Sequence, residues 1–118
     1  MREIKFRAWS KRHQKMTQAM VLKLSLYGQL YEGDPEFNVT DDYILMQFTG
    51  LKDIEGKEIY EGDILARKNK ECDVVVWDKG AFCVRHKNKS MDFIASPNYF
   101  SIVGNVHEHP HLLKERET

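Results

Sequence analysis

The stretch CDVVVWDKGAFCVR, at residues 72–85, decides the fold. Its first six residues include three consecutive valines and Trp77, its last five include Phe82 and Val84, and the turn-forming triplet 78–80 separates them. Apolar, β-branched and aromatic residues on both sides of a short turn with a glycine are typical of a β-hairpin. The sequence therefore predicts antiparallel strands at 73–77 and 81–86.

Further strand-like segments flank this hairpin at short intervals. They lie at 64–68, 91–95 and 99–106, with turn signals at 62–63 and 96–98. No helical period is convincing, and residues 110–118 resemble a short helix or a frayed tail. Short strands in series predict a small all-β barrel or sandwich.

The N-terminal half is predicted to add a β-hairpin. Ile4, Phe6 and Ala8 recur at every second position, which is the period of a half-buried strand, and a polar turn follows at 10–15. Residues 16–31 form one long or two short strands, and 43–48 form another. The fold class is therefore mainly β: a small SH3-like barrel or barrel-like sheet with an N-terminal β-hairpin extension and little helix. We expect residues 1–62 to form the extension, with an acidic glycine-rich loop, and residues 63–118 to form a barrel-like unit packed with it.

Composition and charge limit the function classes. The chain has 118 residues and a mass of 13.9 kDa, with 18 basic and 18 acidic residues, which excludes a large multidomain enzyme. The charges are segregated: residues 1–31 hold seven basic and one acidic residue, residues 32–63 two basic and ten acidic, and residues 64–118 nine basic and seven acidic. A net charge of zero gives no long-range attraction to a polyanion. Pairing of these blocks within the fold or between subunits is therefore favoured over nucleic-acid binding.

The cysteines and the apolar stretches predict the compartment. Cys72 and Cys83 are too few for a disulfide scaffold, and the hairpin places Cys83 opposite Val75 or Val76, away from Cys72. Charges occupy the N-terminus where a signal peptide needs an apolar core, and the most apolar stretch, 20–30, is shorter than the ~20 residues that span a bilayer. We expect a reduced, cytoplasmic protein with no membrane partner.

The segment QFTGLKDIEGKEIYEGDI, at residues 47–64, resembles the signature of the YopX family of phage and prophage proteins. The opening MREIKFRAW at 1–9, with Lys15-Met16, is similar to the N-terminus of that family. The stretch IVGNV at 102–106, followed by Pro110 and Leu112-Leu113, is similar to its C-terminus. The resemblance implies a mainly-β fold and a phage or prophage origin. It supplies no catalytic residues, because the biochemical activity of the family is not established.

The histidines near the C-terminus are the only candidates for a metal site. His107, His109 and His111 alternate, which on an extended segment places them on one face, as a divalent metal would require. Pro110 breaks this geometry, and no cysteine or carboxylate completes the set, so we expect solvated side chains and no metal; His107 and His109 remain the candidates.

The acidic residues of 53–63 do not have the spacing of a calcium loop and are predicted to form turns and a solvated face. The chain also lacks a local signature for a nucleophilic triad or a phosphate-binding loop, and we expect no cofactor.

The strongest candidate for a functional surface is the basic face of the first hairpin. If Ile4, Phe6 and Ala8 face the core, the opposite face and the following turn display five cations and a ring: Lys5, Arg7, Trp9, Lys11, Arg12 and Lys15. Such a face suits single-stranded nucleic acid, through phosphate attraction and base stacking. It suits equally a subunit contact in which Trp9 is the anchor and acidic residues from 32–63 of a neighbour face the cations. In a third arrangement, Trp9 packs under another element and the charges are only solvated.

We therefore predict a non-enzymatic binding or assembly protein, encoded by a phage or prophage, that self-associates as a homo-oligomer. One alternative is a nucleic-acid-binding accessory protein that uses the basic hairpin. The other is a small metal-dependent enzyme that uses His107, His109 and an acidic partner such as Asp63.

Overall fold

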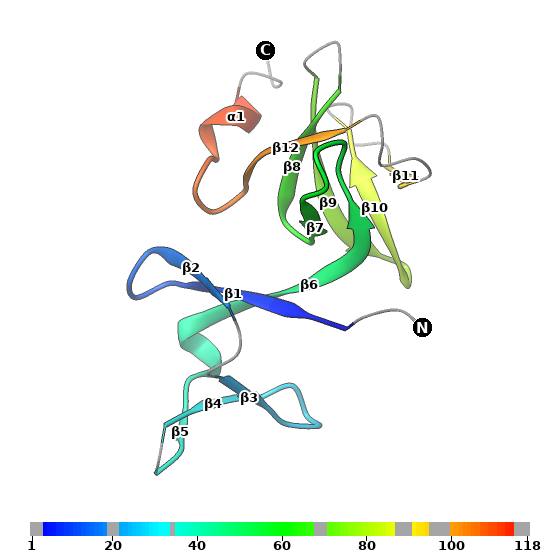
Figure 1. The fold of residues 1–118 in the computed structure, drawn as a ribbon. Helices are drawn as coiled ribbons and strands as arrows, with labels where there is room; N and C mark the ends of the chain where they lie inside the picture. The colour runs from blue at the N-terminus through cyan, green and yellow to red at the C-terminus, as the bar shows by residue number, and fades with distance from the viewer. Residues whose placement is uncertain are drawn as a thin grey trace. The chain divides into compact units, whose positions relative to one another are not determined.

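The computed structural model describes residues 4–18, 22–33, 35–67, 71–86, 91–94 and 100–114. Its contacts divide the chain into two compact units. The small unit comprises residues 5–47, and the large unit comprises residues 48–118 together with the first four residues. Both units are built mainly from β-strands (Figure 1).

The large unit is based on a five-stranded antiparallel sheet that curls into a half-barrel. In spatial order its strands are β11 (Met91–Phe93), β10 (Ala81–Arg85), β9 (Cys72–Asp78), β8 (Asp63–Ala66) and β12 (Ser101–Asn105). The second half of β6 (Tyr43–Lys52) pairs with β7 (Glu58–Tyr60). A short helix, α1 (His111–Lys114), follows β12.

Strands β9 and β10 form the hairpin that the sequence predicts. Trp77 pairs with Phe82, and their ring centroids are 4.7 Å apart in an edge-on arrangement. The turn residues Lys79 and Gly80 have positive φ angles of 49° and 86°. Two successive left-handed residues match the right-handed twist of the flanking strands, which explains the glycine here.

The register of this hairpin also confirms the prediction for the cysteines. Cys83 pairs with Val76, whereas Cys72 pairs with Ala66 on β8. Both cysteines are free thiols. No disulfide therefore constrains the half-barrel.

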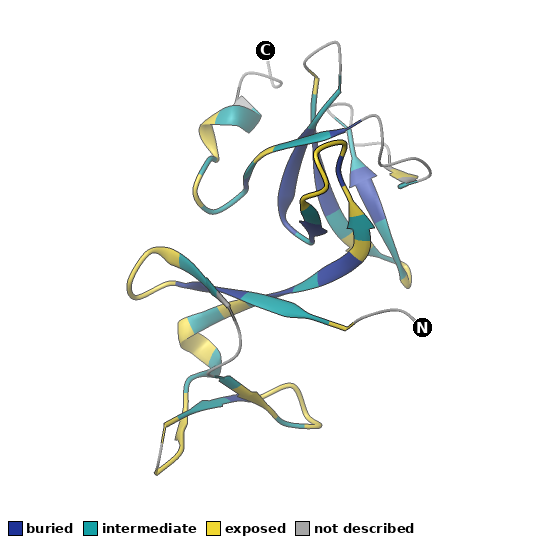
Figure 2. Cartoon of the chain, in the orientation of Figure 1, coloured by how far each residue is buried: buried dark blue, intermediate teal, exposed yellow. Residues whose placement is uncertain are grey.

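The core of the large unit lies on one face of the curled sheet. Leu65, Val75 and Val84 come from β8, β9 and β10, and they cluster with Ile59 and Phe100. Figure 2 colours the buried stretches of this sheet dark blue. Burying one such side chain fully stabilises the folded state by about 1.5–3 kcal/mol. The core therefore draws on both the signature segment and the hairpin.

A buried carboxylate in the signature segment holds the turn after β6. Asp53 is only 5% exposed, and its Oδ1 accepts hydrogen bonds from the backbone N–H groups of Glu55 and Lys57, each at 2.9 Å. Its Oδ2 accepts a bond of 3.0 Å from the N–H of Ile102 on β12. Burial alone would raise the pKa of Asp53, but these three N–H donors, Ile102 foremost, hold it below its ordinary value. Asp53 thus joins its own turn to a strand far along the chain.

Asp63 performs a similar task in the next turn. Its Oδ2 accepts the N–H of Tyr60 at 2.8 Å across Gly62, whose φ is 87°. The N–H of Gly62 donates to the carbonyl of Val75, and its own carbonyl accepts the N–H of Val106. Turn chemistry therefore accounts for both buried acids of the signature segment.

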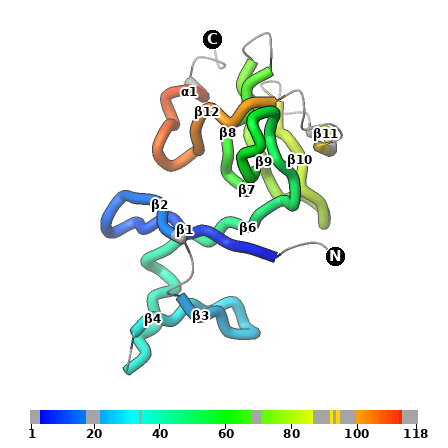
Figure 3. The backbone as a smooth tube through the Cα atoms, in the orientation of Figure 1, coloured from blue at the N-terminus to red at the C-terminus, as the bar shows by residue number. Residues whose placement is uncertain are grey.

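The small unit contains two antiparallel arrangements. In the first, β1 (Phe6–Ser10) is the central strand between β2 (Lys15–Gln18) and the first half of β6. In the second, β4 (Leu30–Glu32) lies between β3 (Leu22–Leu24) and β5 (Phe37–Asn38), and the chain path is traced in Figure 3. A 3₁₀ turn, η2 (Thr40–Asp42), leads into β6.

The structure confirms the mainly-β fold class with little helix and a barrel-like sheet. The segment 16–31, predicted as one long or two short strands, contains β2, β3 and the start of β4. A turn separates β3 from β4, because Gly28 has a φ of 81° and the Ser25 Oγ accepts the N–H groups of Tyr27 and Gln29.

One boundary differs from the one expected. The large unit begins at Phe48 rather than at residue 63, because Leu51 and Ile59 contribute to its core. The predicted strand ends at 68, 95 and 99, the turn at 96–98 and the tail at 115–118 lie outside the described residues. Among the helices in the described ranges, none is long and apolar enough to cross a membrane.

Candidate functional site

Three of the six residues predicted for the basic surface lie on the turn between β1 and β2. Lys11, Arg12 and Lys15 are exposed, and their side chains make no hydrogen bond or ion pair with another described residue. The turn itself is well bonded: the N–H of Gln14 donates to the carbonyl of Ser10 at 2.8 Å, and its Nε2 donates to the carbonyl of Lys11 at 2.7 Å. An ordered backbone therefore displays three cations.

Trp9 does not project beside these cations, which agrees with the third arrangement considered from the sequence, in which Trp9 packs under another element. Its side chain is buried, at 6% exposure, and the register places Trp9 between Met16 on β2 and Ile44 on β6. Directly opposed residues point to the same side of a sheet, so the Trp9 face has apolar neighbours on both flanks. Ala8, on the other face, is fully buried as well. Because β1 is a central strand, the residues on the neighbouring strands decide whether each of its faces is buried. The alternation of apolar and polar residues within β1 does not decide this.

The remaining two residues of the predicted surface are only partly accessible. Lys5 and Arg7 are of intermediate exposure, and the Nη2 of Arg7 donates a hydrogen bond to the Sδ of Met46 at 3.8 Å. The role of all six residues in a contact remains a prediction, and Lys11, Arg12 and Lys15 are its accessible members.

An acidic turn lies directly beside the basic turn in the small unit. The backbone N–H of Lys11 donates to the carbonyl of Asp42 at 2.9 Å, and both Asp41 and Asp42 are exposed on η2. Thr40 fixes this 3₁₀ turn, because its Oγ1 accepts the N–H of Leu30 at 2.8 Å. Opposite charges are thus displayed from two backbone segments that are hydrogen-bonded to each other.

Tyr43, the first residue of β6, bonds to a third acid of the small unit. Its hydroxyl donates to the Oε2 of Glu32 at 3.1 Å. Burial raises the pKa of Tyr43 above its ordinary value, and the bond to the Glu32 carboxylate raises it further. The phenol therefore stays protonated and acts as a hydrogen-bond donor.

One of the C-terminal histidines, His109, has a structural role in the large unit. The Nδ1 of His109 accepts the N–H of Asn105 at 3.2 Å, and a Cβ added at Gly104 would lie 2.6 Å from that nitrogen. The ring of His109 therefore lies against the backbone of Gly104 with one nitrogen occupied. Asp63, the acidic partner considered for a metal enzyme, is buried in its own turn. In the described part of the chain, no group of three or more His, Cys, Asp or Glu side chains could hold a metal ion.

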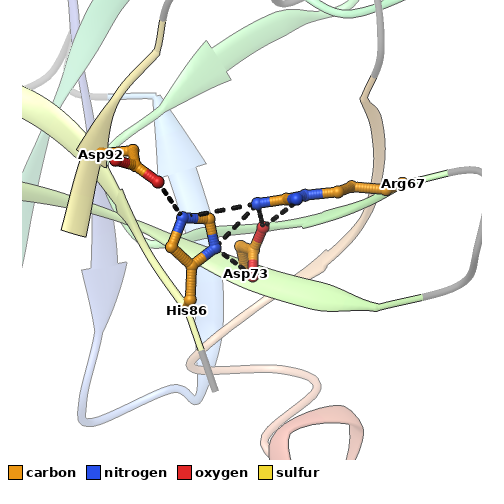
Figure 4. A network of polar contacts seen from close by, with 4 residues as sticks. All are labelled: Arg67, Asp73, His86 and Asp92. Atoms are coloured by element: carbon orange, nitrogen blue, oxygen red, sulfur yellow. Dashed lines mark hydrogen bonds and ion pairs between the residues drawn. The ribbon is translucent and has the colours of Figure 1, made fainter. Parts of the chain in front are cut away.

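A polar network that the sequence analysis missed occupies the large unit (Figure 4). The buried Asp73 on β9 accepts two bonds at its Oδ2, from the Nε and Nη2 of Arg67, at 3.1 and 3.0 Å. Its Oδ1 lies 3.1 Å from the Nδ1 of His86. The Nε2 of His86 lies 2.7 Å from the Oδ2 of Asp92 on β11. The Arg67 guanidinium also lies over the ring of Phe100, 5.7 Å from its centroid.

The two ring nitrogens of His86 have different roles. Nε2 faces the carboxylate of Asp92, so it carries a proton and donates. Nδ1 faces both a donor, the Nη2 of Arg67 at 2.8 Å, and an acceptor, Asp73. A neutral ring accepts from Arg67, whereas a protonated ring donates to Asp73 and balances the second carboxylate.

The sequence contains a signal for this network. In a hairpin where Trp77 pairs with Phe82, counting outward by four residues on each strand brings Asp73 opposite His86. A buried acid opposite a histidine is unusual on a face that otherwise carries Val75 and Val84. Arg67 directly follows β8 and Asp92 lies on β11, and no spacing in the sequence connects them to the hairpin.

Comparisons with known proteins agree with the fold. A solved structure of protein EF1440 from Enterococcus faecalis has a TM-score of 0.68 and 24% identity, covering 96% of this chain and 99% of that one. A solved structure of protein yopX from Bacillus subtilis has a TM-score of 0.62 and 22% identity, with the same coverage. At these identities the likeness shows the fold alone. A comparison with curated proteins found no match.

The family model of the YopX protein matches residues 5–114, which includes the signature segment, both units and the polar network. The resemblance drawn from the sequence is thus confirmed, and the chain belongs to the YopX family.

Proposed function

We propose that this protein is a non-enzymatic binding or assembly protein, of phage or prophage origin, that associates with a second copy of itself through the small unit. The observation that carries the proposal is the hydrogen bond between Lys11 and Asp42, which holds an exposed basic turn beside an exposed acidic turn.

Adjacent patches of opposite charge are self-complementary under two-fold symmetry. When two copies meet about a two-fold axis, the basic turn of each faces the acidic turn of the other, so the same pair of contacts forms twice. Each exposed ion pair contributes only about 0.2–1 kcal/mol, so the charges set register and salt dependence rather than the whole affinity. Exposed apolar side chains of the same unit, such as Phe37 and Ile44, are available to add buried area.

The same geometry disfavours nucleic acid as the partner. Asp41 and Asp42 lie beside the cations and repel phosphates, and the buried Trp9 offers no stacking surface for a base. The acids that could support catalysis in the signature segment, Asp53 and Asp63, are bound to backbone N–H groups. Assembly therefore accounts for more of the exposed chemistry than base recognition or catalysis does.

Charge exchange between two variants tests the proposal. One variant carries Lys11→Glu and Arg12→Glu, and the other carries Asp41→Lys and Asp42→Lys. Each alone places like charges face to face, so its self-association at low salt should weaken about tenfold or more. An equimolar mixture restores both contacts and should associate as the wild type does. A control with Lys52→Glu and Lys79→Glu makes the same charge change as the first variant, but in the large unit. It should self-associate as the wild type does.

Sedimentation velocity at low and moderate salt gives the association state, and anisotropy of labelled single- and double-stranded DNA and RNA is measured in parallel. A wild-type protein that is monomeric at low salt contradicts the proposal. If it then binds nucleic acid in a salt-dependent way that the Lys11 and Arg12 variant loses, the basic turn is a nucleic-acid surface instead.

A further inference from the structure

We propose that Arg67 and His86 form an oxyanion-binding site, that Asp92 of the same chain occupies this site as an internal ligand, and that a carboxylate from another molecule can take its place. The proposal concerns the large unit only and does not depend on the self-association proposed above.

The cationic side of the site is preorganised. Arg67 gives its Nε and Nη2 to the buried carboxylate of Asp73, and its guanidinium rests over Phe100. Asp73 is itself only 2% exposed, so it fixes Arg67 without being able to leave. Asp73 also lies beside the Nδ1 of His86 and orients the imidazole. One buried acid thus holds both donor side chains in place. Supporting contacts of this kind keep the ligand-binding groups of a site in a fixed geometry.

The anionic side of the site is replaceable. Asp92 reaches the Nε2 of His86 at 2.7 Å, yet its side chain is 74% exposed and has no other partner among the described residues. The side chain of His86 is 15% exposed and that of Arg67 is 37% exposed, so both side chains are partly open to solvent. The Nη1 of Arg67 makes no hydrogen bond within the described ranges and remains available to a ligand. Asp92 is therefore the weakly held member of the network, whereas Asp73 is the fixed one.

The chemistry of the site selects a carboxylate. A planar guanidinium next to an imidazole N–H provides hydrogen bonds for the two oxygens of one carboxylate. The group already present is a carboxylate, and Asp92 takes only the imidazole nitrogen, at 2.7 Å, so the guanidinium Nη1 is the further donor that an external carboxylate would use. An external carboxylate also leaves the net charge of the site unchanged, because it replaces the charge of Asp92 there instead of adding to it. An acidic side chain or a small carboxylic acid is the expected ligand class, and phosphate shares enough of the chemistry to need a separate test.

The experiment removes the internal ligand and supplies an external one. Acetate and inorganic phosphate are titrated, in separate series at constant pH and ionic strength, into wild type and into Asp92→Asn. The side-chain NMR signals of the histidines are followed. Because Asp92 is exposed, its replacement leaves the core intact, and backbone spectra verify the fold. Glu55→Gln is the matched control, since it removes an exposed carboxylate elsewhere in the same unit.

In Asp92→Asn, the His86 signals should shift with acetate and saturate, at a concentration about fivefold lower than in wild type or in Glu55→Gln, as expected when a competing exposed ion pair is removed. The exposed His13 of the small unit reports non-specific ion binding and should not saturate. Adding Arg67→Lys to Asp92→Asn should weaken acetate binding, because the ammonium cannot replace the planar donor pair.

Two results would overturn the proposal. One is a His86 response that is linear and equal to that of His13, which indicates an adventitious ion only. The other is a saturating response that is the same in wild type and in Asp92→Asn, because Asp92 would then not be the ligand that blocks the site. Saturation by phosphate at much lower concentration than acetate would contradict the assignment to a carboxylate.

Discussion

Replacing Asp53 with asparagine should destabilise the large unit by about 2–4 kcal/mol. The carboxylate accepts three backbone N–H groups, at 2.9, 2.9 and 3.0 Å, with two on Oδ1 and one on Oδ2. An asparagine side chain has one oxygen and one NH₂ group, so in either orientation at least one buried N–H faces another donor. Losing a bond to a charged acceptor costs about 1.5–3 kcal/mol, and an unsatisfied buried donor costs about 1–3 kcal/mol, with partial overlap between the two.

The assay is urea denaturation followed by circular dichroism, for wild type, Asp53→Asn and Glu55→Gln. The first substitution should lower the midpoint with an unchanged m-value, because the surface exposed on unfolding stays the same. Glu55→Gln removes the same charge from the same turn, but the Glu55 side chain is exposed and, within the described part of the chain, pairs only with Lys57, at 3.5 Å. Its cost should stay below about 1 kcal/mol. If Asp53→Asn is no more costly than Glu55→Gln, the carboxylate does not hold the turn to β12, and the reasoning fails.

The pH dependence gives an independent test of the same bonds. The pKa of Asp53 is lowered in the folded state, so its contribution is complete above the ordinary carboxyl pKa of about 3.9 in the unfolded chain. The contribution is lost as the pH falls through the folded-state pKa. The stability difference between wild type and Asp53→Asn should therefore be constant from neutral pH to about pH 5 and should shrink in more acidic solution.

Three further predictions follow from close packing and burial. Gly104→Ala should lower the free energy of unfolding by about 1–3 kcal/mol in urea denaturation, because its Cβ would lie 2.6 Å from the ring of His109. Adding His109→Gly should recover part of this loss of stability, whereas strictly additive costs of the two substitutions would contradict the contact. Trp9→Ala should cost about 3–5 kcal/mol by circular dichroism, as for a buried ring, and a cost below about 1 kcal/mol would mean that Trp9 is accessible after all. Both thiols should react with Ellman's reagent in the unfolded protein, while in the folded protein the half-buried Cys72 should react before the buried Cys83; a non-reacting pair in denaturant would reveal a disulfide.

The local features of this chain could be read from its sequence, since they depend on residues close together in the chain. The β9–β10 hairpin follows from valines and aromatics around Asp78-Lys79-Gly80, and its register separates the two cysteines, as the structure has it. The carboxylates of Asp53 and Asp63 were expected to serve turns, because acid and glycine recur there at turn spacing. The resemblance to the YopX family rests on this segment and on stretches at both ends of the chain, and the family model agrees.

The exposure and the contacts of the site residues depend on partners from distant parts of the chain, and the sequence alone does not predict these partners. The alternation of β1 indicates that Trp9 projects, but Trp9 lies between Met16 on β2 and Ile44 on β6, and it is buried. Alternation identifies two faces of a strand, whereas the neighbours across the sheet decide which face is apolar. The adjacency of Lys11 and Asp42 likewise exists only because a backbone hydrogen bond joins segments thirty-one positions apart.

The network around His86 shows the same division most clearly. The hairpin register alone brings Asp73 opposite His86, and this pair was open to prediction from the turn. Arg67 and Asp92 join the pair only when β8 and β11 take their places on either side of the hairpin in the curled sheet. Strand identity and hairpin register are therefore written in neighbouring residues, through turn geometry and side-chain alternation. Burial, charge pairing and the composition of each polar cluster arise from the order of strands in the sheet, which no short stretch of this sequence specifies.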